Sequence, residues 1–274
     1  LELLLAQKLA QSQFGQPWST LAAVDQRQLR SRIYREVIKD LWIGTFHALF
    51  ARLLRFDIDK YKDPEGLSWT RQFSIYDEAD AQSLVKEIVT QEQGLDPKRF
   101  EPKKVRWAIS NAKNQGWMPE QLEADAGGQR GKLMAETYRR YRRALAANNA
   151  LDFDDLLLLP VQLLRQNDQI RGYWHRRFRH VLVDEYQDTN RTQYDLLKLL
   201  VTDGHDPETF DRWQGRSVFV VGDADQSIYS FRAADFTILM GFQDDFGDGA
   251  ADGATRTMVK LEENYRSTAT ILEA

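Results

Sequence analysis

Two acidic side chains directly follow a short apolar run in the second half of the chain. Asp184 and Glu185 come after Val181–Val183, a run typical of a buried strand. An aspartate at a strand end can hold a hydrated Mg²⁺ against nucleotide phosphates, and an adjacent glutamate can orient or deprotonate an attacking water. Many strands also end in solvated acids that do no chemistry. The pair alone leaves two interpretations open, a nucleotide site and an ordinary strand end.

A second apolar run, Ser217–Val221, is followed by polar and aromatic residues. Gln226 lies just beyond this run, where its amide can bond to a γ-phosphate or to the attacking water if the two strands are neighbours. Tyr229 and Phe231 offer flat rings for base stacking, which contributes about 1–3 kcal/mol per base in single-strand binders. Core packing is the alternative for both rings. This segment therefore adds a candidate phosphate sensor and a candidate nucleic-acid contact.

A third apolar run, Thr257–Leu261, leads to Tyr265 and Arg266. An arginine there can neutralise charge that develops at a phosphate, and a tyrosine can stack on a nucleobase. Taken alone, an arginine after a strand is more often a surface cation. The order of the three segments is more informative than any one of them.

The elements around these residues alternate between short strands and helices. We expect strands at His180–Val183, Ser217–Val221 and Thr257–Leu261, and helices at Phe153–Arg165, Thr192–Val201 and Phe236–Phe246. Buried strands that alternate with helices are typical of a parallel sheet, in which ligands bind at the carboxyl ends of the strands. We therefore expect Asp184 and Gln226 to share one crevice on neighbouring parallel strands.

The first 150 residues show helical patterns instead. Residues 1–56 indicate helices interrupted at Gly15–Pro17 and at Gly44–Thr45. Prolines and glycines punctuate residues 57–150, and the segments between them, such as Tyr76–Gln93, carry helical periodicity without strand-like alternation. This stretch is predicted to be a compact helical insertion.

Composition limits the class of protein. The chain has 274 residues, 42% hydrophobic and 28% charged, with a net charge of −4 and no cysteine. These values exclude a disulfide framework, a cysteine nucleophile, thiolate metal sites and wholesale disorder. No apolar run approaches the roughly 20 residues that span a bilayer. We expect a cytoplasmic protein without a membrane segment, in which any nucleic acid is held in a local groove. Two arginine clusters, Arg139–Arg143 and Arg171–Arg179, are interpreted as solvated helix faces.

Three blocks in a fixed order resemble motifs II, III and IV of superfamily 1 DNA helicases of the UvrD/Rep/PcrA group. They are Val181–Asn190, Val220–Ala234 and Leu261–Thr268. Gly44–Arg55 is similar to the early strand-contacting segment of that family, and Leu151–Leu157 to its return from an inserted subdomain. The resemblance extends from about residue 40 to the last residue and is patchy through the insertion.

The resemblance implies an α/β fold, a partial RecA-like P-loop NTPase domain whose parallel sheet has flanking helices and carries an inserted all-helical subdomain. Residues 1–56 would be the N-terminal part of the first motor domain. Residues 57–150 would be the insertion, and residues 151–274 the remainder of the motor domain up to motif IV.

The resemblance also implies roles at an ATP site. Asp184 would hold Mg²⁺ through water, and Glu185 would be the catalytic base. Gln226 would couple the γ-phosphate to the DNA site. Arg266 would act at the γ-phosphate, and Tyr265 would stack on the adenine.

Two groups of residues would contact single-stranded DNA by the same resemblance. Residues that follow the second strand would stack on or support the bases, and residues near the start of the chain would line the groove. The first group is Tyr229, Phe231 and Arg232, and the second is Thr45, Phe46 and His47.

One expected element is missing from these 274 residues. ATP hydrolysis in this family needs a glycine-rich phosphate loop with a Lys followed by Thr or Ser. The nearest segment, Gly127–Leu133, fails because Leu133 has no hydroxyl. Leu1–Ala10 also indicates a helix with no capping residue before it. We therefore expect a fragment that is inactive alone.

The leading hypothesis is part of an ATP-dependent DNA helicase or translocase that moves 3′ to 5′ on single-stranded DNA and acts at single-strand/duplex junctions in repair or replication. Its cofactors would be ATP and Mg²⁺. One alternative is a helicase-nuclease subunit of the RecB or AddA type. The other is a non-catalytic DNA-binding module that lacks the phosphate loop.

Overall fold

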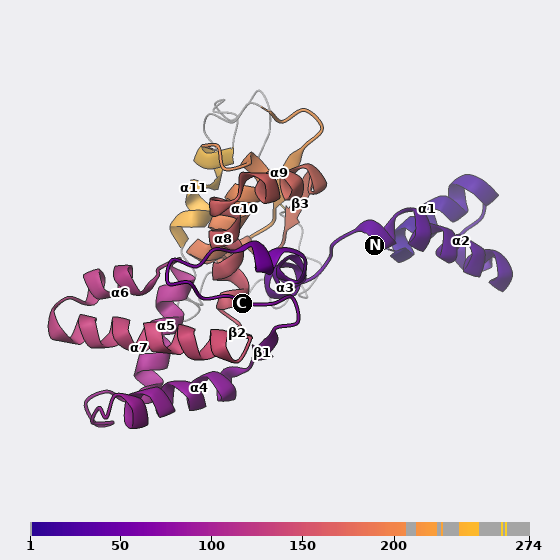
Figure 1. Cartoon of the computed structure of the whole chain (residues 1–274). Coiled ribbons are helices and arrows are strands. Elements are labelled where there is room, and N and C mark those ends of the chain that lie inside the picture. The colour runs from indigo at the N-terminus through magenta and orange to yellow at the C-terminus, as the bar shows by residue number, and fades with distance from the viewer. Residues whose placement is uncertain are drawn as a thin grey trace, which may run out of the picture. The chain divides into compact units, whose positions relative to one another are not determined.

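The computed structural model describes residues 2–206, 212–223, 226, 236–246, 259 and 261. The chain divides into two compact units, Leu1–Leu49 and Phe50–Ala274, and Figure 1 labels their elements. Among the described residues, no helix is both long enough and apolar enough to cross a membrane.

The first unit contains two short helices joined by a turn. Helix α1 (Glu2–Phe14) ends at Gly15, whose φ of +64° is the left-handed conformation that glycine adopts readily after a helix. The short turn η1 (Trp18–Thr20), helix α2 (Ala23–Glu36) and the turn η2 (Ile38–Asp40) follow. The two helices bury a small core made of Ala6, Ala10, Leu21, Leu29 and Ile33. The predicted helices and the interruption at Gly15–Pro17 are confirmed.

From residue 46 onward, helices alternate with short strands. In chain order they are α3 (Phe46–Asp57), η3 (Ile58–Lys60), β1 (Ser74–Tyr76), α4 (Glu78–Glu87), η4 (Ile88–Glu92), α5 (Pro102–Asn114), α6 (Pro119–Ala126), α7 (Gly128–Ala147), β2 (Ala150–Asp152), α8 (Asp155–Gln166), α9 (Asp168–Arg177), β3 (His180–Val183), η5 (Tyr186–Asp188), α10 (Arg191–Thr202), β4 (Ser217–Val220) and α11 (Phe236–Phe246).

Helices α4 to α7 gather around one apolar core (Figure 1). Asp77 starts α4 with a capping box, because its side chain accepts from the Asp80 N–H at 2.9 Å while Asp80 accepts from the Asp77 N–H at 3.2 Å. The core consists of Ala81, Val85, Ile88, Val89, Val105, Ile109, Ala112, Leu122, Met134, Tyr138, Tyr141, Leu145 and Ala150. The helical prediction for most of residues 57–150 is confirmed.

One feature of this region departs from the prediction. Strand β1 pairs in parallel with β2, with Ser74 opposite Ala150 and Tyr76 opposite Asp152. The expectation that residues 57–150 contain no strand is therefore wrong at Ser74–Tyr76. Three residues are too few to show a period of two, and the partner strand is distant in the sequence.

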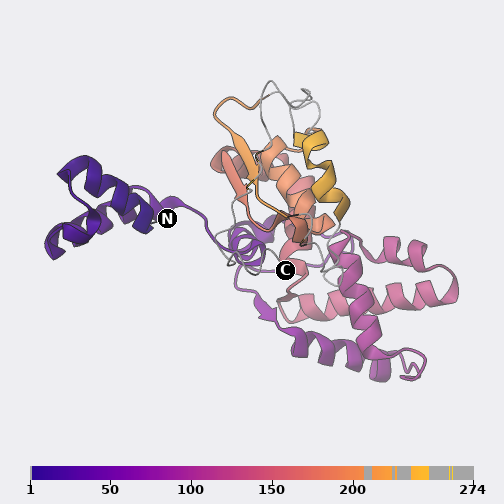
Figure 2. The same cartoon turned by 180° about the vertical axis from the view of Figure 1, so that it is seen from behind.

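The two strands that carry the candidate site form a second parallel pair. His180 lies opposite Ser217 and Val183 opposite Val220, and Figure 2 shows β3 and β4 as adjacent arrows. The predicted strand positions and their parallel, neighbouring arrangement are confirmed. The α/β fold class is confirmed with them.

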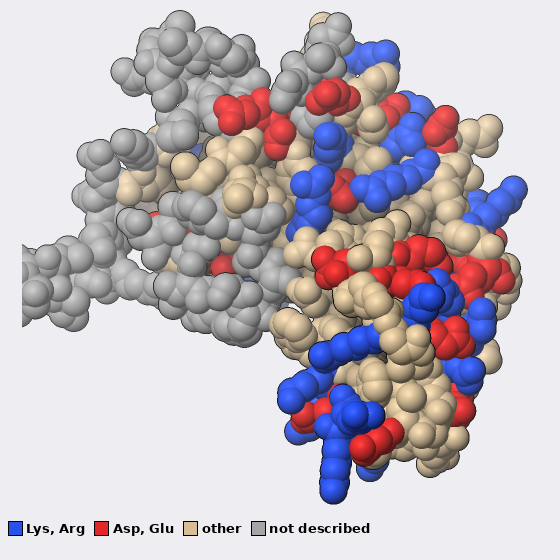
Figure 3. Space-filling model, turned by 90° about the vertical axis from the view of Figure 1, so that its left-hand side faces the viewer, with Lys and Arg blue, Asp and Glu red and all other residues tan. Residues whose placement is uncertain are grey.

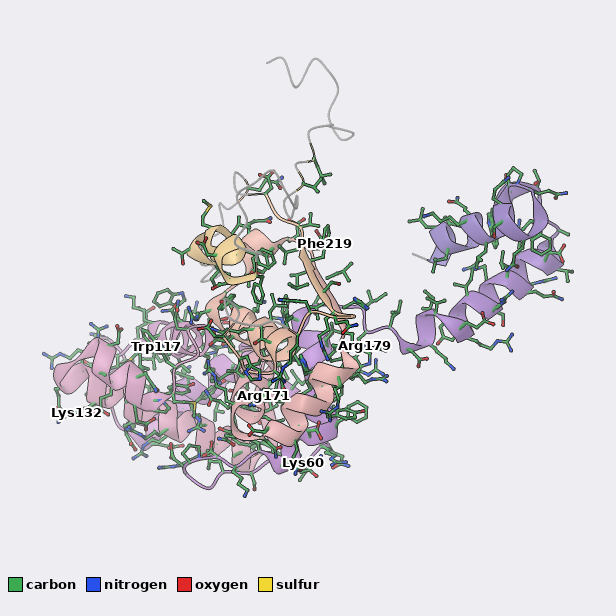
Figure 4. The ribbon with its side chains drawn as sticks, turned by 90° about the horizontal axis from the view of Figure 1, so that it is seen from above. Lys60, Trp117, Lys132, Arg171, Arg179 and Phe219 are labelled. Atoms are coloured by element: carbon green, nitrogen blue, oxygen red, sulfur yellow. The ribbon has the colours of Figure 1, made fainter. Side chains whose placement is uncertain are left out.

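The expectation that both strands are buried is wrong for one face. Val183 is buried, but Leu182 is 73% exposed and Phe219, labelled on β4 in Figure 4, is 56% exposed. Alternate residues of a strand point to opposite faces of a sheet. Continuous apolar runs predicted burial on both faces, whereas Leu182 and Phe219 leave one face of the strand pair exposed.

The four arginines between positions 139 and 143 of α7 are paired with acids. Arg139 bonds to Glu120 and Glu123, Arg140 to Glu136 and Glu92, Arg142 to Asp63 and Glu65, and Arg143 to Glu65. Figure 3 shows basic and acidic side chains interspersed over this side of the molecule. The interpretation of this cluster as a solvated helix face is confirmed for Arg140 and Arg143, whose side chains are 37% and 54% exposed. It is wrong for Arg142, whose side chain is only 5% exposed because it is buried against Asp63.

Two features expected from the sequence remain predictions. The third strand, Thr257–Leu261, lies outside the described residues except for Val259 and Leu261. The three-part division into residues 1–56, 57–150 and 151–274, including a separate inserted subdomain, stays a prediction.

Candidate active site

The acidic pair lies in a strained turn at the carboxyl end of β3. Asp184 accepts the N–H of Glu185 through its Oδ1 at 3.1 Å. Glu185 has a φ of +52°, a left-handed conformation that costs a non-glycine residue about 1–2 kcal/mol. Such strain persists where surrounding contacts overdetermine the backbone, and it concentrates at functional sites.

Backbone hydrogen bonds continue the pairing of the two strands beyond their ends. The N–H of Val221 donates to the carbonyl of Val183 at 2.8 Å, and the N–H of Tyr186 donates to the carbonyl of Val221 at 2.9 Å. The turn that carries Glu185 is thereby fixed beside the segment that leads to Gln226.

Side-chain hydrogen bonds connect Glu185 to Gln226 through two intermediates. Gln187 donates its Nε2 to Glu185 Oε2 at 2.6 Å and accepts the N–H of Asp223 on its Oε1 at 3.1 Å. Asp223 Oδ2 then accepts Gln226 Nε2 at 2.7 Å. The acid pair and the glutamine, which were expected to meet at one sheet edge, are thus joined by three consecutive hydrogen bonds.

A glycine permits this close approach. A Cβ added at Gly222 would lie 3.0 Å from Gln187 Oε1 and 3.2 Å from the Gln187 backbone nitrogen. The backbone nitrogen cannot withdraw without disturbing the turn. A side chain at position 222 would therefore require Gln187 to shift by a few tenths of an ångström.

The acids are exposed while their supports are buried. Asp184, Glu185 and Gln226 all face solvent, whereas Tyr186 is fully buried and Gln187 is 3% exposed. The Tyr186 ring packs edge-on against Phe242 of α11 at 5.3 Å between centroids, and burial raises the pKa of its hydroxyl. The turn presents two carboxylates to solvent from a packed base.

This donor set fits Mg²⁺ held mainly by water and phosphate. Among the described residues, no group of three or more His, Asp or Glu side chains is arranged to hold a metal, so an ion here would depend on few protein ligands. Magnesium commonly binds through one or two carboxylates and keeps several waters. One exposed aspartate at a strand end is consistent with that mode.

The segment after the turn is anchored on α5. Asn190 caps α10 by accepting the N–H of Gln193 at 2.9 Å, and its Nδ2 donates to Asn114 Oδ1 at 2.6 Å. The Thr192 hydroxyl donates to the carbonyls of Lys113 and Asn114 at 2.8 and 2.9 Å. These bonds satisfy carbonyls that a helix C-terminus leaves free.

Lys113 ties α5 to the start of α8. It is fully buried, and its Nζ lies 2.9 Å from Asp152 Oδ2 and 2.7 Å from Asp155 Oδ1. Burial acts to lower the pKa of Lys113, but Asp152 and Asp155 outweigh it and raise that pKa. Within Leu151–Leu157, Asp152 and Asp155 therefore neutralise the buried charge of Lys113.

The expected groove residues Thr45, Phe46 and His47 belong to the Leu1–Leu49 unit. Thr45 is exposed and caps α3, since its Oγ1 accepts the N–H of Ala48 at 3.3 Å. Phe46 and His47 are half-buried. Their contact with DNA stays a prediction.

Five predicted site residues lie outside the described residues, and their roles stay predictions. They are Tyr229, Phe231, Arg232, Tyr265 and Arg266.

Sequence reasoning missed Gln187, Gly222, Asp223 and Asn190 as parts of the site. The sequence offered one local indication, which is the polar residue Gln187 two positions after Glu185. The reach of its side chain to the next strand depends on tertiary geometry and not on spacing.

Comparisons with known proteins agree with the motifs. The pattern of the UvrD/REP helicase N-terminal domain matches residues 19–247. The ATP-dependent DNA helicase PcrA of Bacillus subtilis strain 168 is 37% identical over 265 residues, which cover 94% of this chain and 32% of that protein. PcrA of Staphylococcus epidermidis strain RP62A is 35% identical over 253 residues, covering 92% and 31%. PcrA of Staphylococcus aureus strain Mu50 is 35% identical over 251 residues, covering 90% and 31%. The chain spans about a third of the length of these curated relatives.

Proposed function

The chain belongs to the UvrD/Rep helicase family, and we propose that the residues after β3 and β4 form part of the ATP-hydrolysis site of an ATP-dependent DNA helicase. The observation that carries the proposal is the hydrogen-bonded path from Glu185 through Gln187 and Asp223 to Gln226. It joins a candidate base to the segment whose next residues are the candidate DNA contacts. A helicase needs such a connection, because hydrolysis must be linked to the state of the strand.

Each residue has a defined task at the nucleotide. Asp184 holds Mg²⁺ through water, and the ion when bound neutralises charge on the β- and γ-phosphates. Glu185 accepts the proton of the attacking water. Gln226 donates its amide towards the γ-phosphate, Arg266 stabilises the charge that develops there, and Tyr265 stacks on the adenine.

The proposed substrate is single-stranded DNA, including junctions with duplex DNA, with movement from 3′ to 5′ in repair or replication in the cytoplasm. Aromatic, basic and hydroxyl side chains would contact the strand by stacking and by hydrogen bonds to its phosphates. These are Thr45, Phe46, His47, Tyr229, Phe231 and Arg232. Because the 274 residues contain no phosphate loop, we propose that they do not hydrolyse ATP by themselves.

The test is Glu185→Gln in the full-length protein, compared with Glu87→Gln, an exposed glutamate of α4. We expect Glu185→Gln to bind nucleotide as wild type does and to lose turnover by orders of magnitude, since only the proton acceptor is removed. Glu87→Gln should match wild type. Unchanged turnover in Glu185→Gln would show that Glu185 is not the base. DNA binding without any nucleotide binding would favour the non-catalytic module.

A further inference from the structure

We propose that Gln187 is a positioning residue that fixes the carboxylate of Glu185 and ties it to the segment after β4. The proposal rests on the proposed function, because it assigns Glu185 as the base. Gln187 itself touches no nucleotide in this scheme. It acts through Glu185 on one side and Asp223 on the other.

Both ends of the Gln187 amide are used, and its orientation is determined by its partners. An ionised carboxylate such as Glu185 can only accept a hydrogen bond, and the backbone N–H of Asp223 can only donate one. The Nε2 must therefore face Glu185 and the Oε1 must face Asp223. If the amide were flipped, both hydrogen bonds would be lost, so only one orientation of the Gln187 side chain is compatible with its two neighbours.

Burial makes these two bonds consequential. Gln187 is 3% exposed, so water cannot readily replace a partner that is lost. The turn around it is closed by the Asp188 N–H on the Glu185 carbonyl at 3.0 Å and by the Thr189 N–H on the Tyr186 carbonyl at 3.1 Å. The backbone is therefore held while the Gln187 side chain spans the gap between the two strands.

Gln187 also connects Glu185 to Asp223, in addition to holding the Glu185 carboxylate in place. The Gln187 amide contacts the Asp223 N–H directly, and Asp223 holds Gln226 at 2.7 Å. A displacement of Asp223 changes the position of the hydrogen-bond partner of Gln187 Oε1, and the planar amide transfers that change to Nε2 and thus to Glu185.

Two variants separate the two bonds. Gln187→Met fills a similar volume and makes neither hydrogen bond. Gln187→Glu keeps an acceptor for the Asp223 N–H but places a second carboxylate against Glu185. Gln121→Met is the matched control, because it removes the hydrogen bond that the Gln121 side chain accepts from the Met118 N–H at the start of α6 and leaves the bonds of Glu185 unchanged.

The first measurement is steady-state ATPase in the full-length protein. For Gln187→Met we expect kcat to fall roughly 10- to 100-fold, as when a residue that orients a catalytic group is removed, with KM for ATP changed by no more than about threefold. For Gln187→Glu we expect a similar fall in kcat, because the new carboxylate cannot donate to Glu185 and repels it. Gln121→Met should keep the wild-type kcat and KM.

The second measurement is amide hydrogen exchange at Asp223, which needs no activity. We expect faster exchange in Gln187→Met and near wild-type exchange in Gln187→Glu. A wild-type kcat in folded Gln187→Met, or an unchanged Asp223 exchange rate, would overturn the inference while the helicase assignment stands. A wild-type protein without ATPase would instead refute the proposed function, and the inference with it.

Discussion

Replacing Lys113 by methionine should destabilise the fold more than any exposed lysine of the same helix. Lys113 is fully buried and balances two carboxylates, with Nζ 2.9 Å from Asp152 and 2.7 Å from Asp155. Methionine keeps most of the apolar volume, so packing loss is small. What is lost is the cation, and removing one partner of a buried ion pair costs about 3–5 kcal/mol. We expect the free energy of unfolding to fall by about 4 kcal/mol at pH 8.

The loss should depend on pH with a definite sign. Burial and then the charge of Asp152 raise the pKa of Asp155 to about 7, against the opposing effect of Lys113. The folded protein holds this proton more tightly than the unfolded chain, so the stability that Asp155 contributes is lost as pH rises through about 7. Without Lys113 the pKa of Asp155 rises further. At pH 5 the carboxyl is already neutral, and we expect a loss of about 2 kcal/mol or less.

Urea unfolding followed by circular dichroism at pH 5 and pH 8 measures both values. Lys104→Met is the control, because Lys104 pairs with Glu101 on the surface, where 77% of its side chain is exposed, and should change stability by about 0.5 kcal/mol or less. Lys113→Met/Asp155→Asn should recover part of the loss at pH 8. If the free energy of unfolding of Lys113→Met is within about 1 kcal/mol of wild type at pH 8, Lys113 is not needed to stabilise the buried charges of Asp152 and Asp155, and the reasoning is refuted.

Two further predictions concern the site and the strand. Gly222→Ala should lower the free energy of unfolding by about 1–3 kcal/mol, because its Cβ meets Gln187 Oε1 at 3.0 Å and the Gln187 nitrogen at 3.2 Å; a thermal melt equal to that of wild type would contradict the close approach. Tyr229→Ala in the full-length protein should weaken single-stranded DNA binding by about 1–3 kcal/mol with little change in ATP affinity. Unchanged strand affinity in a fluorescence anisotropy titration would place the ring in the core instead.

Sequence patterns predicted the local elements well because local periodicity determines them. Phe236–Phe246 is helical as expected, and β3 occupies His180–Val183 as expected. The short strand at Ser74–Tyr76 was not predicted, because it forms by parallel pairing with β2, which is distant in the sequence. The exposure of Leu182 and Phe219 was not predicted, because an apolar run indicates that burial is favourable but does not show which neighbours would bury it.

The candidate site was predictable where strand order alone decides proximity. Asp184, Glu185 and Gln226 follow two neighbouring parallel strands, so the rule for strand ends brings them together. Gln187 and Lys113 could not be predicted in this way. Lys113 belongs to a helix with several lysines, and only the fold puts it against Asp152 and Asp155.

The contacts around Glu185 are unequal on its two sides, and this inequality bears on coupling. Towards α10 the chain is buried and multiply bonded, with Asn190 and Thr192 both fixed on the end of α5. Towards β4 the side-chain path runs through Asp223 and Gln226, which are both exposed. Under the proposed function, this exposed end of the path is the side on which a bound DNA strand would act, and the buried segment at Asn190 and Thr192 is the fixed reference.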